Sequence, residues 1–470
     1  MKSVSKFILI GMGTLMLCLY ITSAMPESAC IRLNPDDRIF SGLQKAIENV
    51  RANETAELLI TGQVVEQEPV VLRGLHLTIR LVEGGSLQML GGIQAYEGTT
   101  LILDGNMEIL GQILCEDSEL RLCRGVEVYA SDTAVRIRNG SGTFESCHCE
   151  GKVGIDLEAS DAVFLGGEYR GEPALMAVRS KIETIEDGTF LSQDREAVYL
   201  AHSWIGTIQN GRFEKMADTG ALSRGAFYMD HESCIERIEG GIFRAASGSG
   251  LLMIRGACIR EISGGTFQSL TDAVNQPFCH HALFILAGSD GFRTGVKTIS
   301  GGTFESAGRT DAAALCAYCN AQGEVYIGEI TGTACFSGSS GLLVGSTHSQ
   351  GKARIERIDG GTFLSDCAAT ATAESALLVS TGVVENITAG TFLGNGTAPA
   401  IGLSRYCETD TGEMGEGGRI QEISGGDMIA SGTAPALYCA AQGSGVTLIS
   451  GGFFYGDSAV LIDNDEDLVI

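Results

Sequence analysis

Three short stretches bring together side chains that can bind a soft metal ion. Cys316-Ala-Tyr-Cys319 has the spacing of half a zinc site, while Cys147-His-Cys149 and Cys279-His-His281 join thiols and imidazoles. One half-site does not make a metal centre, and no partner motif accompanies the other two. On a strand, residues three apart point to opposite faces. We therefore interpret all three stretches as structural, and we assign no catalytic residue, no metal ligand and no cofactor.

Paired carboxylates are the second chemistry that this composition offers. The chain holds 58 Asp and Glu against 32 Lys and Arg, a formal charge of −26. Carboxylates about 5–10 Å apart can hydrolyse glycosidic bonds, but a surface of stacked strands brings such pairs together everywhere. The charge argues against nucleic acid as a partner, because phosphate would be repelled. Its simplest interpretation is a soluble, acidic and extensively exposed surface.

The first 24 residues have the pattern of a secretory signal peptide. Lys2 and Lys6 precede an apolar run from Phe7 to Tyr20, and Thr22-Ser23-Ala24 places small residues before a cleavage point after Ala24. An uncleaved membrane anchor is the alternative, because residues 7–24 are nearly long enough to span a bilayer. No second apolar run of that length follows. We expect a secreted, extracellular protein, free or held at the cell surface, with no stable membrane span after cleavage.

The elements that would position any site come from a repeated phrase, Ile-x-x-Ile-x-Gly-Gly-Thr-Phe, which residues 259–267 carry in full. The shortest spacings between copies, about 21–25 residues, define the unit, and longer ones are the same unit with an insertion. Clear copies end at Phe190, Phe213, Phe243, Phe267, Phe304, Phe363 and Phe392, and weaker ones at Phe144, Tyr169, Phe336, Met428 and Phe454.

The short apolar segments between glycines predict strands and not helices. Ile259 and Ile262 are three apart, so on one strand they face one core only if the chain bends between them. Phe267 is a further five residues on and needs a second bend. Gly264-Gly265 can supply it, because glycine accepts a positive φ or a bulge without steric strain. The glycines therefore turn a corner that lets every apolar residue point inward.

Units with three strands and three corners predict an all-β parallel solenoid. Stacked at about 4.8 Å, the coils would form a rod of roughly 75 Å. We predict strands in the N-terminal coils at Leu58–Ile60, Val70–Leu72, Leu77–Ile79, Leu101–Leu103 and Val126–Val128. A short capping helix should precede them. Its acids are Asp36 and Asp37, and its apolar stripe is Phe40, Leu43, Ala46, Ile47 and Val50.

The chain therefore divides into a signal peptide (1–24), an N-terminal cap with a short helix (25–57) and a parallel β-helix (58–470), whose regular Gly-Gly-Thr-Phe coils begin at about residue 130. No C-terminal cap is evident. The last coil passes through Ala459–Ile462, and an open solenoid end is an edge-pairing hazard. Either the charges of the acidic stretch Asp463–Asp467 prevent pairing at this open end, or another protomer or more chain covers the end. We expect end-to-end self-association there.

Two cysteines test the register. Cys234 and Cys258 each precede their Ile-x-x-Ile phrase and lie 24 residues apart, in consecutive coils. Equivalent positions should be about 5 Å apart at the Cα atoms, and strand alternation points both outward. We predict that they stack directly, and an oxidising exterior would allow a bridge.

The pattern resembles the pectate-lyase-like superfamily of right-handed parallel β-helices over about residues 30–470. The cap is similar to that of polygalacturonase-like and phage tailspike-like chains, with Asp36, Asp37, Ala46 and Ile47 matching. The repeats resemble those of large secreted adhesin-like proteins of Gram-positive gut bacteria. This resemblance implies a single-stranded right-handed β-helix. Bacterial leucine-rich repeats are the rival fold, but their stricter period and second phrase are absent.

The catalytic motifs of the family are missing. Asn-Thr-Asp, Gly-His-Gly and Arg-x-Pro-x-x-Arg do not occur, the single Asp-Asp lies in the cap, and Arg179-Ser-Lys181 matches Arg-x-Lys only as a lone tripeptide. Insertions are expected mainly at one corner, at Ala287–Thr294, Asn320–Glu324, Thr347–Ala353 and Tyr406–Gly418. We expect a non-catalytic, adhesin-like binding or stalk module with a glycan or a host or cell-surface ligand. A polysaccharide lyase or glycoside hydrolase of the same fold is the alternative.

Overall fold

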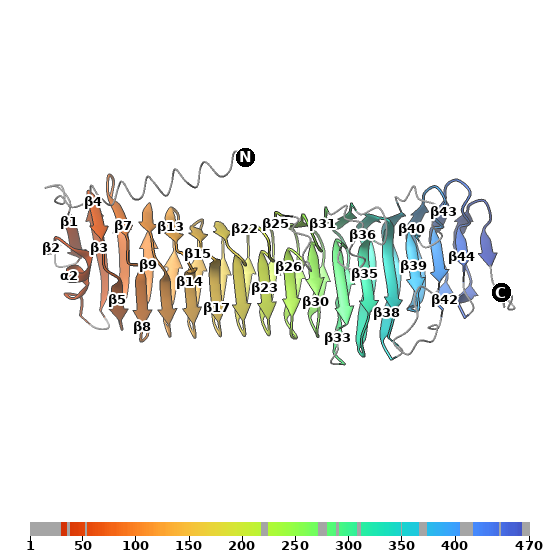
Figure 1. The fold of residues 1–470 in the computed structure, drawn as a ribbon, viewed down its shortest axis with the longest axis horizontal. Coiled ribbons are helices and arrows are strands. Elements are labelled where there is room, and N and C mark those ends of the chain that lie inside the picture. Colours follow the sequence, from red (N-terminus) through yellow and green to blue (C-terminus); the bar gives the residue numbers. More distant parts are fainter. Residues whose placement is uncertain are drawn as a thin grey trace.

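The computed structural model is a rod made almost wholly of β-strands that run across its long axis (Figure 1). It describes residues 30–34, 38–51, 54–217, 224–270, 280–287, 291–307, 312–348, 350–365, 374–404, 417–440 and 443–462. The predicted signal peptide lies outside these residues. β1 and β44 mark opposite ends of the rod in Figure 1.

The strands fall into three series, and one strand of each, in chain order, makes one repeat. The leading series is a parallel sheet of 16 strands. Its members are β5 (Val70–Arg73), β8 (Ile93–Tyr96), β11 (Ile113–Glu116), β14 (Thr133–Arg138), β17 (Val153–Glu158), β20 (Leu175–Val178), β23 (Val198–Ala201), β26 (Phe227–Asp230), β29 (Leu251–Met253), β32 (Leu283–Ala287), β35 (Ala313–Cys319), β37 (Ser340–Ser346), β39 (Leu377–Ser380), β41 (Ile401–Ser404), β44 (Leu437–Cys439) and β47 (Val460–Ile462).

The middle series contains the Ile-x-x-Ile segments. Its members are β3 (Thr55–Thr61), β6 (His76–Leu81), β9 (Thr100–Asp104), β12 (Glu119–Leu122), β15 (Ser141–Phe144), β18 (Asp161–Phe164), β21 (Lys181–Ile185), β24 (Trp204–Ile208), β27 (Cys234–Ile238), β30 (Cys258–Ile262), β33 (Arg293–Ile299), β36 (Glu324–Gly338), β38 (Lys352–Ser365), β40 (Val383–Gly394), β42 (Arg419–Ile423) and β45 (Gly445–Ile449).

The trailing series contains the Thr-Phe segments. Its members are β4 (Gln63–Glu66), β7 (Ser86–Met89), β10 (Met107–Ile109), β13 (Val126–Tyr129), β16 (His148–Glu150), β19 (Glu168–Arg170), β22 (Thr189–Ser192), β25 (Arg212–Lys215), β28 (Ile242–Ala245), β31 (Thr266–Ser269), β34 (Thr303–Ser306), β43 (Asp427–Ala430) and β46 (Phe453–Tyr455). Because β36, β38 and β40 run through both the middle and the trailing positions, the two series belong to one 31-stranded sheet, which also includes β1 and β2 at the N-terminal end.

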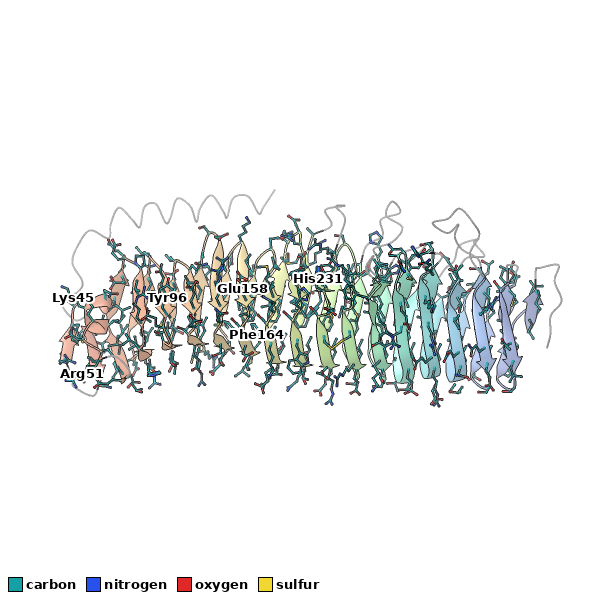
Figure 2. All side chains as sticks on the ribbon, turned by 90° about the horizontal axis from the view of Figure 1, so that it is seen from below. Lys45, Arg51, Tyr96, Glu158, Phe164 and His231 are labelled. Carbon is teal, nitrogen blue, oxygen red and sulfur yellow. A yellow bond between two sulfur atoms is a disulfide. The ribbon has the colours of Figure 1, made fainter. Side chains whose placement is uncertain are left out.

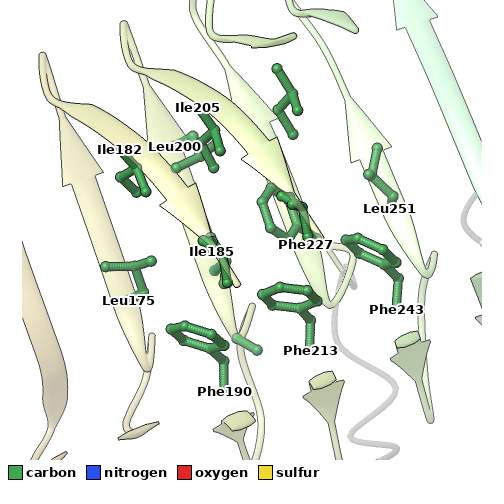
Figure 3. Packing of buried hydrophobic residues seen from close by; sticks show 14 of the residues in the cluster. Leu175, Ile182, Ile185, Phe190, Leu200, Ile205, Phe213, Phe227, Phe243 and Leu251 are labelled. Carbon is green, nitrogen blue, oxygen red and sulfur yellow. The ribbon is translucent and has the colours of Figure 1, made fainter. Parts of the chain in front are cut away.

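The core is a set of side-chain ladders along the rod axis, because parallel stacking repeats each position from strand to strand. Phe267 pairs in register with Phe243 on one side and Phe304 on the other, and both ring-to-ring distances are 4.6 Å. Ile259 and Ile262 are fully buried. Figure 3 shows part of this packing, with Phe190, Phe213 and Phe243 in one row. The expected inward orientation of the phrase is confirmed.

Both predicted bends are present. Between Ile259 and Ile262 two consecutive residues face outward, and the pairing with β27 skips one residue there. Gly265 has a φ of +98°, a left-handed conformation that favours glycine. A Cβ on Gly264 would collide with the carbonyl oxygen of Glu239 in the neighbouring repeat. Gly264 is therefore required by close backbone approach and Gly265 by its conformation.

The corner after many of the leading strands has a different structural basis, which we did not predict. Residues other than glycine adopt a positive φ there, including Ala159, Arg179 and His202. A serine follows each of these three. The backbone N–H of Ser180 donates to Ser203 Oγ at 3.1 Å, and Ser203 Oγ bonds the carbonyl of Ala201 at 2.9 Å. The serines thus form a hydrogen-bonded ladder. Figure 2 labels Tyr96, Glu158 and His231, which lie at or directly after the ends of the leading strands β8, β17 and β26.

The N-terminal end differs from the expected helix. The only helix among the described residues is α2 (Leu43–Ile47), a single turn whose Leu43, Ala46 and Ile47 are buried. Phe40 lies instead on β2 (Arg38–Phe40), which pairs antiparallel with β1 (Cys30–Asn34). Because Phe40 pairs with Ile31 as part of a strand, the residues before Gly42 are extended and cannot belong to the helix. Val50 lies beyond it, and Asp36 and Asp37 lie outside the described residues.

The five predicted N-terminal strands are confirmed within β3, β5, β6, β9 and β13. The prediction that insertions open mainly at one corner is wrong. Long connections also enter the leading strands, between β25 and β26, between β31 and β32, and between β38 and β39. Both corners that flank the leading sheet therefore accept extra residues, because neither carries the tight Gly-Gly turn.

Candidate functional site

An open hollow of about 440 Å³ lies on the outer face of the middle strands, within the size range of small-molecule sites. We call it the charged hollow. It spans four consecutive repeats, on β24, β27, β30 and β33. Its lining residues are Thr207, Glu236, Arg237, Arg260, Glu261, Lys297 and Thr298.

The local fold explains why these residues share one surface. Each lies between the two inward aliphatic residues of its strand, which are two isoleucines on β24, β27 and β30 and Val296 and Ile299 on β33. Register then stacks them: Thr207 pairs with Arg237, which pairs with Glu261, which pairs with Thr298. Aligning the repeats by their isoleucines would have found this column. We did not single it out because each residue alone is an ordinary surface residue.

The only tryptophan of the chain is hydrogen-bonded to Glu236, one of the residues that line the charged hollow. Trp204, the first residue of β24, donates from Nε1 to Glu236 Oε1 at 3.0 Å. The Lys181 ammonium lies 5.3 Å from the centre of the indole ring. The indole is thus fixed in orientation by a hydrogen bond on one edge and a cation–π contact.

The charges of the hollow form crosswise pairs between neighbouring repeats. Arg260 Nε lies 3.1 Å from Glu236 Oε2, and Arg237 Nε lies 3.3 Å from Glu261 Oε2. Hydrogen bonding to Glu239 and attraction to Glu261 raise the pKa of Arg237. Lys297 forms no ion pair with any described residue. Three cations thus face two carboxylates here, on a chain whose total charge is strongly negative.

The predicted cysteine pair lies beside the hollow. Cys234 and Cys258 pair in register on β27 and β30, and they form a disulfide with a Cα–Cα distance of 4.7 Å. The next residue in this column is Gly295, where a side chain would overlap Tyr326 of the following repeat. Arg293 covers the Tyr326 ring at 3.9 Å. Small residues therefore separate two aromatic rings, Trp204 and Tyr326, along the rod.

A second polar cluster lies on the outer face of the leading strands. The rings of Tyr199 and Tyr228 stack at 5.6 Å, and the Arg224 guanidinium lies 4.9 Å from the Tyr228 ring. Arg255 binds Asp230 through two nitrogens. Burial raises the pKa of Tyr228 to about 12. Since Tyr228 and Asp230 are almost fully buried, this cluster serves packing more than ligand access.

The soft-ligand stretches take structural positions. Cys149 points into the core, while His148 lies outside against Tyr129 at 5.2 Å. On β35, Cys316 packs in an outer apolar cluster and Cys319 in the core. Burial raises the pKa of both thiols.

His281 is buried and its Nδ1 lies 3.1 Å from the backbone nitrogen of Ala313, while Cys279 lies outside the described residues. In the described part of the chain no three His, Cys, Asp or Glu side chains gather as metal ligands would. Arg179 occupies a corner, 2.7 Å from Glu158. The ammonium group of Lys181 contacts the Trp204 ring, so Arg179 and Lys181 do not face a common site.

A scan against protein-family models and searches of the curated proteins and of the solved structures found no match to this chain. Among the residues described, no helix has the length and apolar character needed to cross a membrane.

Proposed function

We propose that the protein is a secreted or cell-surface repeat protein that binds a glycan at the charged hollow without chemically changing it. The observation that carries this proposal is the fixed Trp204 ring beside a surface of guanidinium, ammonium, carboxylate and hydroxyl groups. An aromatic face packs against the apolar face of a sugar ring, and charged donors and acceptors bond its hydroxyls.

The architecture that we propose for this function is a single-stranded right-handed β-helix like that of the pectate-lyase-like superfamily. Three parallel series with short connections support it, because parallel strand connections are right-handed in nearly all proteins. We propose that α2 and the β1–β2 pair close its N-terminal end, since α2 contacts β1, β2 and β5. A rigid rod of this kind also suits an adhesin-like stalk that displays a site away from its attachment.

Secretion is part of the proposal. The signal-like pattern of residues 1–24 supports it, and so does a disulfide in a half-buried outer position, because such bonds persist in oxidising compartments. The acidic composition supports a freely exposed surface.

A lyase or hydrolase is the second candidate, and one observation favours it: Glu236 and Glu261 face the same hollow. Each carboxylate is, however, engaged by a guanidinium from the neighbouring repeat. A general acid or base must reach the proton of the substrate, and both carboxylates are already held in these ion pairs. Binding without turnover is therefore the better conclusion.

The test is a glycan array and calorimetry with the secreted chain and three variants, followed by assays for reducing ends and unsaturated products. Trp204→Ala and Lys297→Ala should each weaken binding at least about tenfold, or about 1.4 kcal/mol. Lys352→Ala, an exposed cation on β38 outside the hollow, is the matched control and should bind normally. Binding that survives Trp204→Ala would overturn the site, and any released product would establish the enzyme instead.

A further inference from the structure

Two imidazoles meet at the corner that follows the leading strands. His202 comes directly after β23 and His231 directly after β26, in consecutive repeats of the rod (Figure 2). Both residues have a positive φ, and the backbone N–H of His202 donates to the carbonyl of His231 at 2.9 Å. The two ring centres lie 5.1 Å apart, with 41° between the ring planes. We call these two side chains the histidine pair.

The fold of the repeat does not require histidine at this corner. The side chain of His202 is exposed and that of His231 is 39% exposed, so neither fills the core. The chain has seven histidines, and two of them lie here in adjacent repeats. Other residues take the same positive-φ position directly after β14, β17, β20 and β39, namely Asn139, Ala159, Arg179 and Thr381.

A buried carboxylate orients one ring of the histidine pair. His231 Nδ1 lies 3.0 Å from Asp230 Oδ1. Asp230 is almost fully buried, and Arg255 holds its carboxylate through two nitrogens. A neutral imidazole that donates from Nδ1 to a carboxylate presents an unprotonated Nε2 as a ligand. Carboxylates orient metal-binding histidines in the same way.

The second ring is available to a ligand. Among the described residues, the His202 ring contacts the His231 ring and has no hydrogen-bond partner. The cations on either side of the histidine pair are already engaged by carboxylates. Arg179 lies 2.7 Å from Glu158, and Arg255 is bound to Asp230. Their positive charge is therefore balanced locally, and it does not exclude a second cation from the histidine pair.

We propose that the histidine pair binds one divalent transition-metal ion of the kind that prefers imidazole, such as Cu²⁺, Ni²⁺ or Zn²⁺. Two imidazoles joined to one ion by bonds of about 2.0–2.1 Å have ring centres about 4.5–5 Å apart for angles between square and tetrahedral. The observed separation of 5.1 Å is close to this value. We assigned no metal ligand from the sequence, because only the stacking of repeats brings the two histidines together.

The site differs from a structural or catalytic zinc centre, which has three or four protein ligands. Here the protein supplies two imidazoles, so solvent completes the coordination of the ion. The general order of divalent-metal affinities predicts that Cu²⁺ binds most tightly. Because the ion would join two consecutive repeats of the folded rod, its binding should also raise the temperature of unfolding.

Calorimetric titration of the secreted chain, produced without a histidine tag and freed of metal by a chelator, with CuCl₂, NiCl₂ and ZnCl₂ tests the proposal. One ion should bind per chain, with Cu²⁺ the tightest. His202→Ala and His231→Ala should each weaken Cu²⁺ binding at least about tenfold. His76→Ala is the matched control and should bind normally, because the register neighbours of His76 are Thr55 and Thr100. Circular dichroism verifies that each variant folds.

Electron paramagnetic resonance of the Cu²⁺-loaded chain gives a second measurement. The wild type should show nitrogen coupling from two imidazoles, and either histidine variant from one. Absence of binding below about 1 mM metal would overturn the proposal, as would equal affinity in the wild type and both histidine variants. Coupling from a single imidazole in the wild type would also overturn it. The ligands are not residues that line the charged hollow, so glycan binding is a separate measurement.

Discussion

Cys234 and Cys258 occupy the same register position on consecutive middle strands, and a disulfide joins them across a Cα–Cα distance of 4.7 Å. Ile235 and Ile259, the residues that follow them, are fully buried. The bond therefore joins two repeats on the outer side of the sheet, in the same column of register positions as Trp204.

Removing this bond should destabilise the rod. The variant Cys234→Ser/Cys258→Ser should lose about 3 kcal/mol of unfolding free energy, because a loop of this length is no longer constrained in the unfolded chain. Denaturant unfolding measures the loss. Reductant should lower the stability of the wild type by a similar amount and leave the double variant unchanged. Mass mapping that found both thiols free would contradict the prediction.

Truncating a ring in the aromatic ladder should cost more. Phe267 is fully buried between Phe243 and Phe304, and Phe267→Ala should reduce the free energy of unfolding by about 3–5 kcal/mol through lost burial and a cavity. Gln268→Ala, the outward neighbour, is the control and should cost only about 1 kcal/mol, because it loses hydrogen bonds to Arg244 and Glu305 but leaves no cavity in the core. A loss below about 1 kcal/mol for Phe267→Ala would be inconsistent with the observed register.

The two glycines of the corner should both resist substitution, for different reasons. Gly264→Val forces a side chain against the Glu239 carbonyl, and Gly265→Val strains a backbone with φ of +98°. Each should cost about 1–3 kcal/mol in thermal or denaturant unfolding. At Gly445, where an added Cβ meets nothing within 4 Å, the same substitution should be much milder. Equal melting of the corner variants and the parent would disprove this assignment.

Acid should weaken the protein partly through His281. Burial lowers the pKa of this imidazole to about 4 in the folded chain, whereas an unfolded histidine has the ordinary value of 6.5. Between these values the unfolded chain binds a proton that the folded chain excludes. The free energy of unfolding therefore falls as pH drops from 6.5 toward 4, by about 1.4 kcal/mol per pH unit from this group. Above pH 6.5 its contribution is constant.

Unfolding curves at several pH values measure this slope. His281→Asn should be less stable at neutral pH but should show a shallower fall between pH 6.5 and 4. His148→Asn, which removes an imidazole at a half-buried outer position, serves as the control substitution. If the free energy of unfolding fell equally steeply with pH in the wild type and in His281→Asn, His281 would not be the cause of the acid sensitivity.

Much of the fold was predictable because the spacing of residues within one repeat determines the local backbone conformation. Ile259, Ile262 and Phe267 have spacings that require two bends, and adjacent glycines occur where the second bend is needed. Parallel stacking then carries each position to the next repeat, which is why two cysteines 24 residues apart could be placed together. The short helix was predicted too long because strand pairing between Ile31 and Phe40 competes with it.

The candidate site depended on relationships between repeats that are not local. The sequence by itself determined which residues point inward, because strand alternation and glycine corners act within a few residues. Only the tertiary structure showed that Glu236, Arg260 and Lys297 share a hollow beside Trp204, since insertions of unequal length hide their common register along the chain. It also decided that His281 is buried and that Leu448 is exposed, because burial depends on what neighbouring repeats place around a residue and not on the residue itself.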